Sequence, residues 1–98
     1  FFVPESNLEE VKEALFKSGA GKIGNYSHCA WQVKGWGQFK PLPGSNPYSG
    51  EENRLKRVEE WRVELVVEKS KIKEVMTAFR AAHPYETPAY EVLEVLDF

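Results

Sequence analysis

The densest group of chemically active side chains lies in residues 82–88, with the sequence AHPYETP. The segment combines an imidazole, a phenol and a carboxylate with two prolines, whose rigid backbone lowers the entropy lost when polar groups are held in one arrangement. His83 beside Glu86 is a pair that can ligate a divalent metal ion or move a proton. The alternative interpretation is a stiff helix-to-strand turn, in which Tyr85 packs and His83 bonds a nearby carbonyl.

A second candidate region is the connection between residues 37 and 50, which is dense in proline, glycine and asparagine. Neither a helix nor an inner strand tolerates so many turn formers, so this stretch predicts a long exposed loop. Long loops in small domains are often functional. With this loop included, the candidate ligand-binding residues are His83, Tyr85, Glu86, Phe39, Lys40 and Tyr48.

The other histidine, His28, precedes the only cysteine, Cys29. In an extended strand, adjacent residues point to opposite faces, so these two cannot hold one ion together. We expect Cys29 to be a small buried apolar residue. His28 is a candidate metal ligand together with His83 and Glu86, at a site shared with another subunit; a hydrogen-bonded sheet histidine is the alternative.

Two familiar phosphate and nucleic-acid motifs are excluded. The glycine-rich residues 19–24 follow a predicted helix and precede a predicted strand, whereas a P-loop needs a helix N-terminus behind its glycines. The aromatic residues 36–40 resemble those of an RNA-recognition module, but Glu59, Glu60 and Glu64 lie where such a module needs basic and aromatic side chains. No serine or cysteine nucleophile with a paired base is identifiable.

Composition predicts one globular domain, residues 1–98, because a chain of 98 residues has room for one modest core. Hydrophobic residues make up 42% and charged residues 29%, and the formal net charge is −2. Without a basic field, neither nucleic acid nor an anionic membrane is an expected partner. A single cysteine and the absence of an export pattern predict a cytoplasmic protein.

The periodicity of the apolar residues predicts six elements in the order strand, helix, strand, strand, helix, strand. The four strands are residues 1–3, which form the end of a strand, 26–36, 60–67 and 89–96. The two helices are residues 6–18, with a capping box at Ser6 and Glu9, and residues 70–83, with Ser70 as the cap. This order predicts an α+β fold, a ferredoxin-like βαββαβ sandwich with a four-stranded antiparallel sheet.

The predicted last strand, residues 89–96, is apolar on both faces. Two helices cover only one side of a four-stranded sheet, so the other side needs another cover. We therefore expect self-association through the sheet into a closed symmetric oligomer.

Four motifs in this order resemble a known family: residues 19–29, 35–41, 46–48 and 83–86. Together they resemble the insert domain of YqfO-type proteins, in the NGG-interacting-factor-three-like family. The resemblance implies a fold like that of the PII signalling and CutA proteins, a homotrimer, and ligand sites at intersubunit clefts. It also implies that the 37–50 loop and the His83 turn lie at one end of the sheet, opposite residues 19–25. The dinuclear metal ligands of that family belong to flanking halves that this chain does not contain.

The function predicted from the sequence is a homotrimeric binding or regulatory module for a small molecule or a divalent metal ion at intersubunit clefts, without catalysis. The candidate cofactor is a divalent metal ion. The alternatives are a small hydrolase that uses His83 and Glu86 as acid and base, and a structural subunit of a larger complex.

Overall fold

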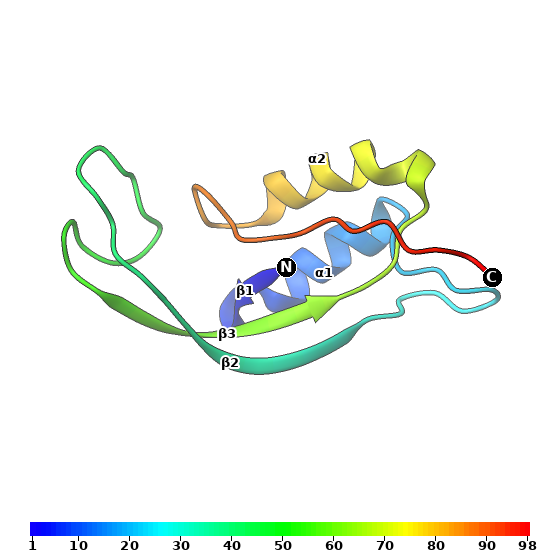
Figure 1. The fold of residues 1–98 in the computed structure, drawn as a ribbon, viewed down its shortest axis with the longest axis horizontal. Helices are drawn as coiled ribbons and strands as arrows, with labels where there is room; N and C mark the ends of the chain where they lie inside the picture. The colour runs from blue at the N-terminus through cyan, green and yellow to red at the C-terminus, as the bar shows by residue number, and fades with distance from the viewer.

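A computed structural model describes residues 1–98 and shows two α-helices on one face of a three-stranded antiparallel sheet (Figure 1). The elements are β1 (Phe2–Pro4), α1 (Leu8–Lys17), β2 (Trp31–Phe39), β3 (Lys56–Glu64) and α2 (Ile72–Ala82), with 3₁₀ turns at Glu5–Asn7 and Lys69–Lys71. The strand order in the sheet is β1-β3-β2. No helix combines the length and apolarity that a membrane span requires.

The core lies between the helices and the sheet. It consists of the buried residues Val3, Leu8, Val11, Leu15, Ala20, Val63, Val75 and Phe79. α1 contributes the three residues that the sequence places at helical spacing, α2 contributes Val75 and Phe79, and β3 contributes Val63. Burial of these core residues holds both helices on one face of the sheet. The opposite face has no helix over it, and we call it the helix-free face.

The predicted helix caps at Ser6 and Ser70 are wrong. No side chain caps α1 or α2, and each helix instead follows a 3₁₀ turn that satisfies part of its free backbone. The predicted helix ends are confirmed. Gly19 follows α1 with a φ of 113°, and His83 ends α2 in an extended conformation, as expected before Pro84.

The second strand begins at Trp31 rather than at residue 26 and continues to Phe39. Residues 21–30 instead form a turn closed by the bridge Ile23↔Tyr26, in which His28 has a φ of 58° that no extended strand adopts. Cys29, predicted to be buried, is partly exposed for the same reason.

The register of β2 on β3 decides which side chains face the helices. Lys34 lies opposite the core-facing Trp61, whereas Val33 lies opposite Arg62. Directly opposed residues of an antiparallel pair point to the same face. Val33, Arg62 and their alternate neighbours therefore occupy the helix-free face.

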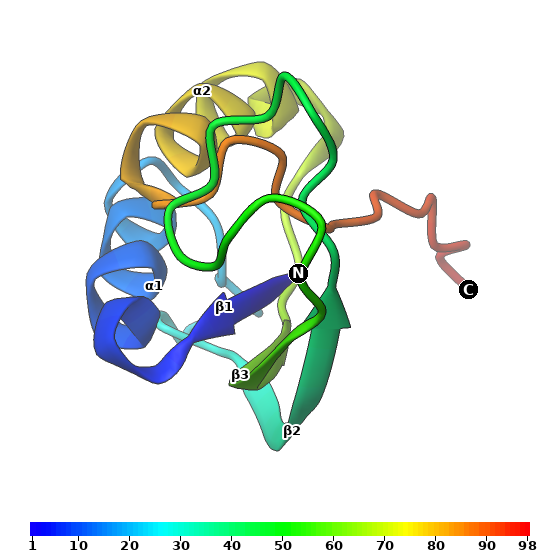
Figure 2. The same ribbon diagram turned by 90° about the vertical axis from the view of Figure 1, so that its left-hand side faces the viewer.

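The predicted fourth strand is wrong, and the sheet has three strands rather than four. The backbone N–H of Phe2 donates to the carbonyl of Ala89 at 3.2 Å, but residues 90–98 form no ladder, and after Tyr90 the chain leaves the body of the domain (Figure 2). A strand without a partner has no backbone bonds to hold it.

Candidate functional site

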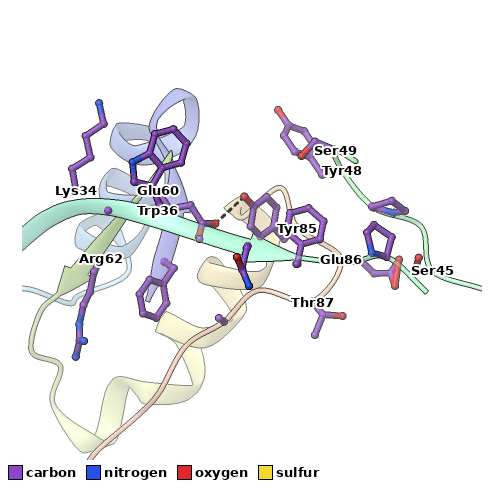
Figure 3. Close-up of a pocket in the computed structure, with 18 of the residues that line it drawn as sticks. Lys34, Trp36, Ser45, Tyr48, Ser49, Glu60, Arg62, Tyr85, Glu86 and Thr87 are labelled. Atoms are coloured by element: carbon purple, nitrogen blue, oxygen red, sulfur yellow. Dashed lines mark hydrogen bonds between the residues drawn. The ribbon is translucent and has the colours of Figure 1, made fainter. Parts of the chain in front are cut away.

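A cavity of about 620 Å³ lies on the helix-free face of the sheet (Figure 3). Its floor is formed by residues 33–39 of β2 together with Glu60 and Arg62 of β3. The loop between these strands, residues 40–55, forms one wall, and the segment after α2, residues 85–89, forms the other. The cavity is therefore built from segments that are distant in the sequence.

Two glycines keep the floor of the cavity open. Gly35 and Gly37 both point their missing side chains to the helix-free face, and a Cβ atom at Gly35 would meet nothing within 4 Å. At Gly37 a Cβ atom would collide with the carboxylate of Glu60, which lies over this residue. Gly37 thus provides the space in which Glu60 sits.

Tyr85 lies at the centre of the cavity wall. Its hydroxyl donates a hydrogen bond to Oε2 of Glu60 at 2.9 Å, and its ring centroid lies 6.4 Å from that of Phe39 and 6.2 Å from that of Tyr48. Burial raises the pKa of the Tyr85 hydroxyl, and the Glu60 carboxylate raises it further. The hydroxyl therefore remains a protonated donor at neutral pH. We call Phe39, Tyr48 and Tyr85 the aromatic cluster.

Glu86 connects the two walls. Its Oε2 accepts a hydrogen bond from the backbone N–H of Asn46 at 2.6 Å, which joins the tip of the 40–55 loop to the turn after α2. The prediction that loop and turn lie at one end of the sheet, opposite the residues after α1, is confirmed (Figure 1).

The charges around the cavity are not balanced. The Lys34 ammonium lies 3.0 Å from a β3 carboxylate, and the Arg62 guanidinium lies 3.8 Å from Glu64. Neither Glu60 nor Glu86 has a cationic side chain within ion-pair distance. The cavity thus contains two carboxylates without cationic partners, while Lys34 and Arg62 are already paired.

His83 is buried behind the cavity rather than in it, with 6% of its surface exposed. Its Nε2 lies 2.7 Å from the carbonyl oxygen of Phe2, and its Nδ1 accepts the backbone N–H of Tyr85 at 3.1 Å. These partners assign the proton to Nε2 and occupy both ring nitrogens, and burial lowers the pKa of the imidazole. His83 therefore positions Tyr85, and this geometry gives no support to a metal ligand or acid–base role.

The remaining predicted site residues lie outside the cavity. His28 is in the loop at the opposite end of the sheet, where its Nε2 lies 3.7 Å from Glu13 and its ring 4.8 Å from that of Phe16 (Figure 1). Lys40 begins the long loop but does not line the cavity. The chain brings no three His, Cys, Asp or Glu residues together as a metal site. A site that joins His28 to His83 and Glu86 of another subunit stays a prediction.

No known family model matches the chain. The chain is 47% identical over 94 residues to the GTP cyclohydrolase 1 type 2 homolog of Bacillus subtilis and 46% identical over 95 residues to that of Mycobacterium tuberculosis. These matches cover 96% and 97% of the chain and 25% of each relative. This chain is homologous to one segment of these GTP cyclohydrolase 1 type 2 homologs.

A solved structure agrees with this relationship. The crystal structure of a Bacillus cereus protein related to NIF3 matches with a TM-score of 0.78 and 44% identity, over 92% of this chain and 22% of that one. The chain thus spans about a quarter of the length of the GTP cyclohydrolase 1 type 2 homologs that it matches. The family resemblance predicted from the four motifs is confirmed, as is the α+β class.

Sequence reasoning missed Glu60 and Gly37 as parts of the site. Glu60 served only as an argument against RNA binding, and Gly37 only as the start of a loop. The signal was present in the alternation of β2, where Gly35 and Gly37 recur on one face and open it. What was missing was the register that places Glu60 opposite Gly35 and next to Gly37.

Proposed function

We propose that this domain is a homotrimeric binding or regulatory module, which takes a small ligand into the cavity on the helix-free face and completes the site with a neighbouring subunit. One observation carries the proposal. Tyr85 and Glu86, from the turn after α2, meet Phe39 and Tyr48, from the β2 end and the long loop, around one cavity. The volume of about 620 Å³ fits a small molecule, because ligand pockets commonly measure about 300–1,000 Å³.

The assembly part of the proposal rests on exposed apolar surface. Leu93, Val95 and Leu96 of the C-terminal segment are at least 75% exposed, and Trp31 on the helix-free face is 61% exposed. Exposed apolar side chains that gather in one segment mark an interaction site. A closed symmetric oligomer would cover both the segment and the face, and the cavity lies on the same face.

The side chains that line the cavity are suited to binding a ligand rather than to catalysis. His83, the natural acid–base candidate, has both nitrogens engaged away from the cavity. The relatives are named for GTP cyclohydrolase, and any such activity belongs to proteins about four times as long as this segment. We propose that the segment regulates or supplies ligand to the larger protein in which it occurs.

The test is a thermal-shift screen of the domain over nucleotides, amines and divalent metal ions. A ligand at about 100 times its Kd stabilises the fold by roughly 2.7 kcal/mol, which corresponds to roughly 10–20 °C in a domain of this size. The shift should disappear in Tyr85→Leu and persist in Tyr26→Leu, which removes an exposed tyrosine at the opposite end of the sheet.

Sedimentation tests the assembly separately. We expect a trimer at micromolar concentration, and we expect a chain cut after Tyr90 to sediment as a monomer, because the cut removes the exposed apolar segment. A monomeric full chain together with silence across the ligand panel would contradict the proposal.

A further inference from the structure

We infer that the cavity selects an organic ammonium ion, a ligand that joins a positively charged nitrogen to an apolar part. This inference rests on the proposed function, because it specifies the chemistry of the ligand in the same cavity. It follows from the aromatic cluster, from two carboxylates that have no ion-pair partner, and from the ion pairs of Lys34 and Arg62, the two cationic residues that line the cavity.

The aromatic cluster provides the first step. The rings of Phe39 and Tyr48 are tilted by 49° and 47° to the ring of Tyr85, so neither stacks flat on it, and all three line the cavity. The face of an aromatic ring attracts a cation within about 6 Å of its centroid. Sites that bind alkylated ammonium ions combine several such rings, and Figure 3 shows Tyr48 and Tyr85 on the side of the cavity where the loop and the turn meet.

The carboxylates provide the second step. Glu60 uses Oε2 to accept from Tyr85, which leaves Oε1 without a hydrogen bond in the chain, and Glu86 likewise uses only Oε2. Each free oxygen is an acceptor without a donor. A ligand that brings N–H groups or a positive charge would therefore satisfy groups that the chain leaves open, and the two carboxylates would draw it in electrostatically.

The same charges disfavour the other ligand classes. A phosphate or carboxylate would meet two unpaired acids, while Lys34 and Arg62 are already held by other carboxylates. A bare divalent metal ion prefers a shell of about six to eight oxygen ligands for calcium, or a near-octahedral shell for magnesium. No cluster of three candidate ligating residues exists in the chain. The aromatic rings would contribute nothing to such an ion.

The test compares choline with 3,3-dimethylbutan-1-ol, which has the same shape but no charge. Binding of both to the domain is measured by isothermal titration calorimetry, with phosphate and magnesium chloride as further probes. We expect choline to bind at least tenfold more tightly than the neutral analogue, and phosphate and magnesium not to bind in the cavity. In Glu60→Gln, which keeps the acceptor for Tyr85 but removes the charge, choline affinity should fall about three- to tenfold.

The matched control is Glu10→Gln, which removes one exposed carboxylate from α1 and changes the net charge equally. It should leave choline binding unchanged. Equal binding of choline and its neutral analogue, abolished by Tyr85→Leu, would overturn the inference while leaving the binding pocket intact. Failure of choline, its analogue and the whole nucleotide, amine and metal panel to bind would overturn the proposed function as well.

Discussion

The substitution Gly37→Ala tests whether the cavity depends on the Glu60 carboxylate. A methyl group at residue 37 would occupy the space that this carboxylate fills, so the side chain of Glu60 must swing away and release the hydroxyl of Tyr85. Gly35→Ala is the matched control, because Gly35 lies on the same strand and the same face, and an added methyl group there would meet nothing within 4 Å.

The expected magnitude follows from the interactions that change. A hydrogen bond to a charged group contributes about 1.5–3 kcal/mol, and the partial exposure of Glu60 and Tyr85 favours the lower end of this range. Replacing glycine by alanine in a strand raises the free energy of unfolding by about 0.5–1 kcal/mol, because alanine lowers the conformational entropy of the unfolded chain. Gly37→Ala should therefore lower the free energy of unfolding by about 1 kcal/mol, whereas Gly35→Ala should raise it by about 0.5–1 kcal/mol.

The assay is urea denaturation followed by tryptophan fluorescence, to which Trp61, packed against the core, contributes together with Trp31 and Trp36. The two variants should differ by roughly 1.5–2 kcal/mol, or about 6–16 °C in Tm for a domain of this size. In a double-mutant cycle, Tyr85→Phe should have little further effect in the Gly37→Ala background, because the hydrogen bond is already lost. Equal stabilities of the two alanine variants, or full additivity of Gly37→Ala and Tyr85→Phe, would refute the reasoning.

Two further predictions concern His83 and the core. Burial lowers the pKa of His83 below its ordinary value of 6.5, so the native state prefers the neutral ring. The stability of the fold should therefore be complete above pH 6.5 and decline as the pH falls through the lowered pKa. Urea midpoints between pH 5 and pH 8 measure this dependence, and His83→Gln should flatten it. Phe79→Ala removes a ring that is 2% exposed and contacts Phe1, His83 and Tyr90. It should lower the free energy of unfolding by about 3–5 kcal/mol and so unfold much of the population at room temperature, as circular dichroism would show. A cooperative transition with a free energy of unfolding within about 1 kcal/mol of the wild type would contradict the assigned core.

Local signals determined the helices, the presence of the two long strands and the turn after α2, but they placed both strands several residues from their observed bounds. The apolar spacing of Leu8, Val11 and Leu15 predicts α1 because a helix turns once every 3.6 residues, and the His83-Pro84 pair predicts the end of α2 because proline excludes the helical conformation before it. The four motifs likewise carry the relationship to the GTP cyclohydrolase 1 type 2 homologs. These features depend on residues that are close in the chain.

Pairing between distant segments was decided only by the tertiary structure. Residues 89–96 have the composition of a strand, yet beyond Ala89 they form no ladder, because a strand is held only by backbone hydrogen bonds to a neighbouring strand. The imidazole of His83 could in principle act in catalysis or bind a metal ion, yet its Nε2 is hydrogen-bonded to the carbonyl oxygen of Phe2. From the sequence, Glu60 is an ordinary exposed acid. Only the register of β2 on β3 shows that it lies over Gly37 and bonds to Tyr85. Composition limits what a side chain can do, but the groups that reach it through folding decide which of those roles is open.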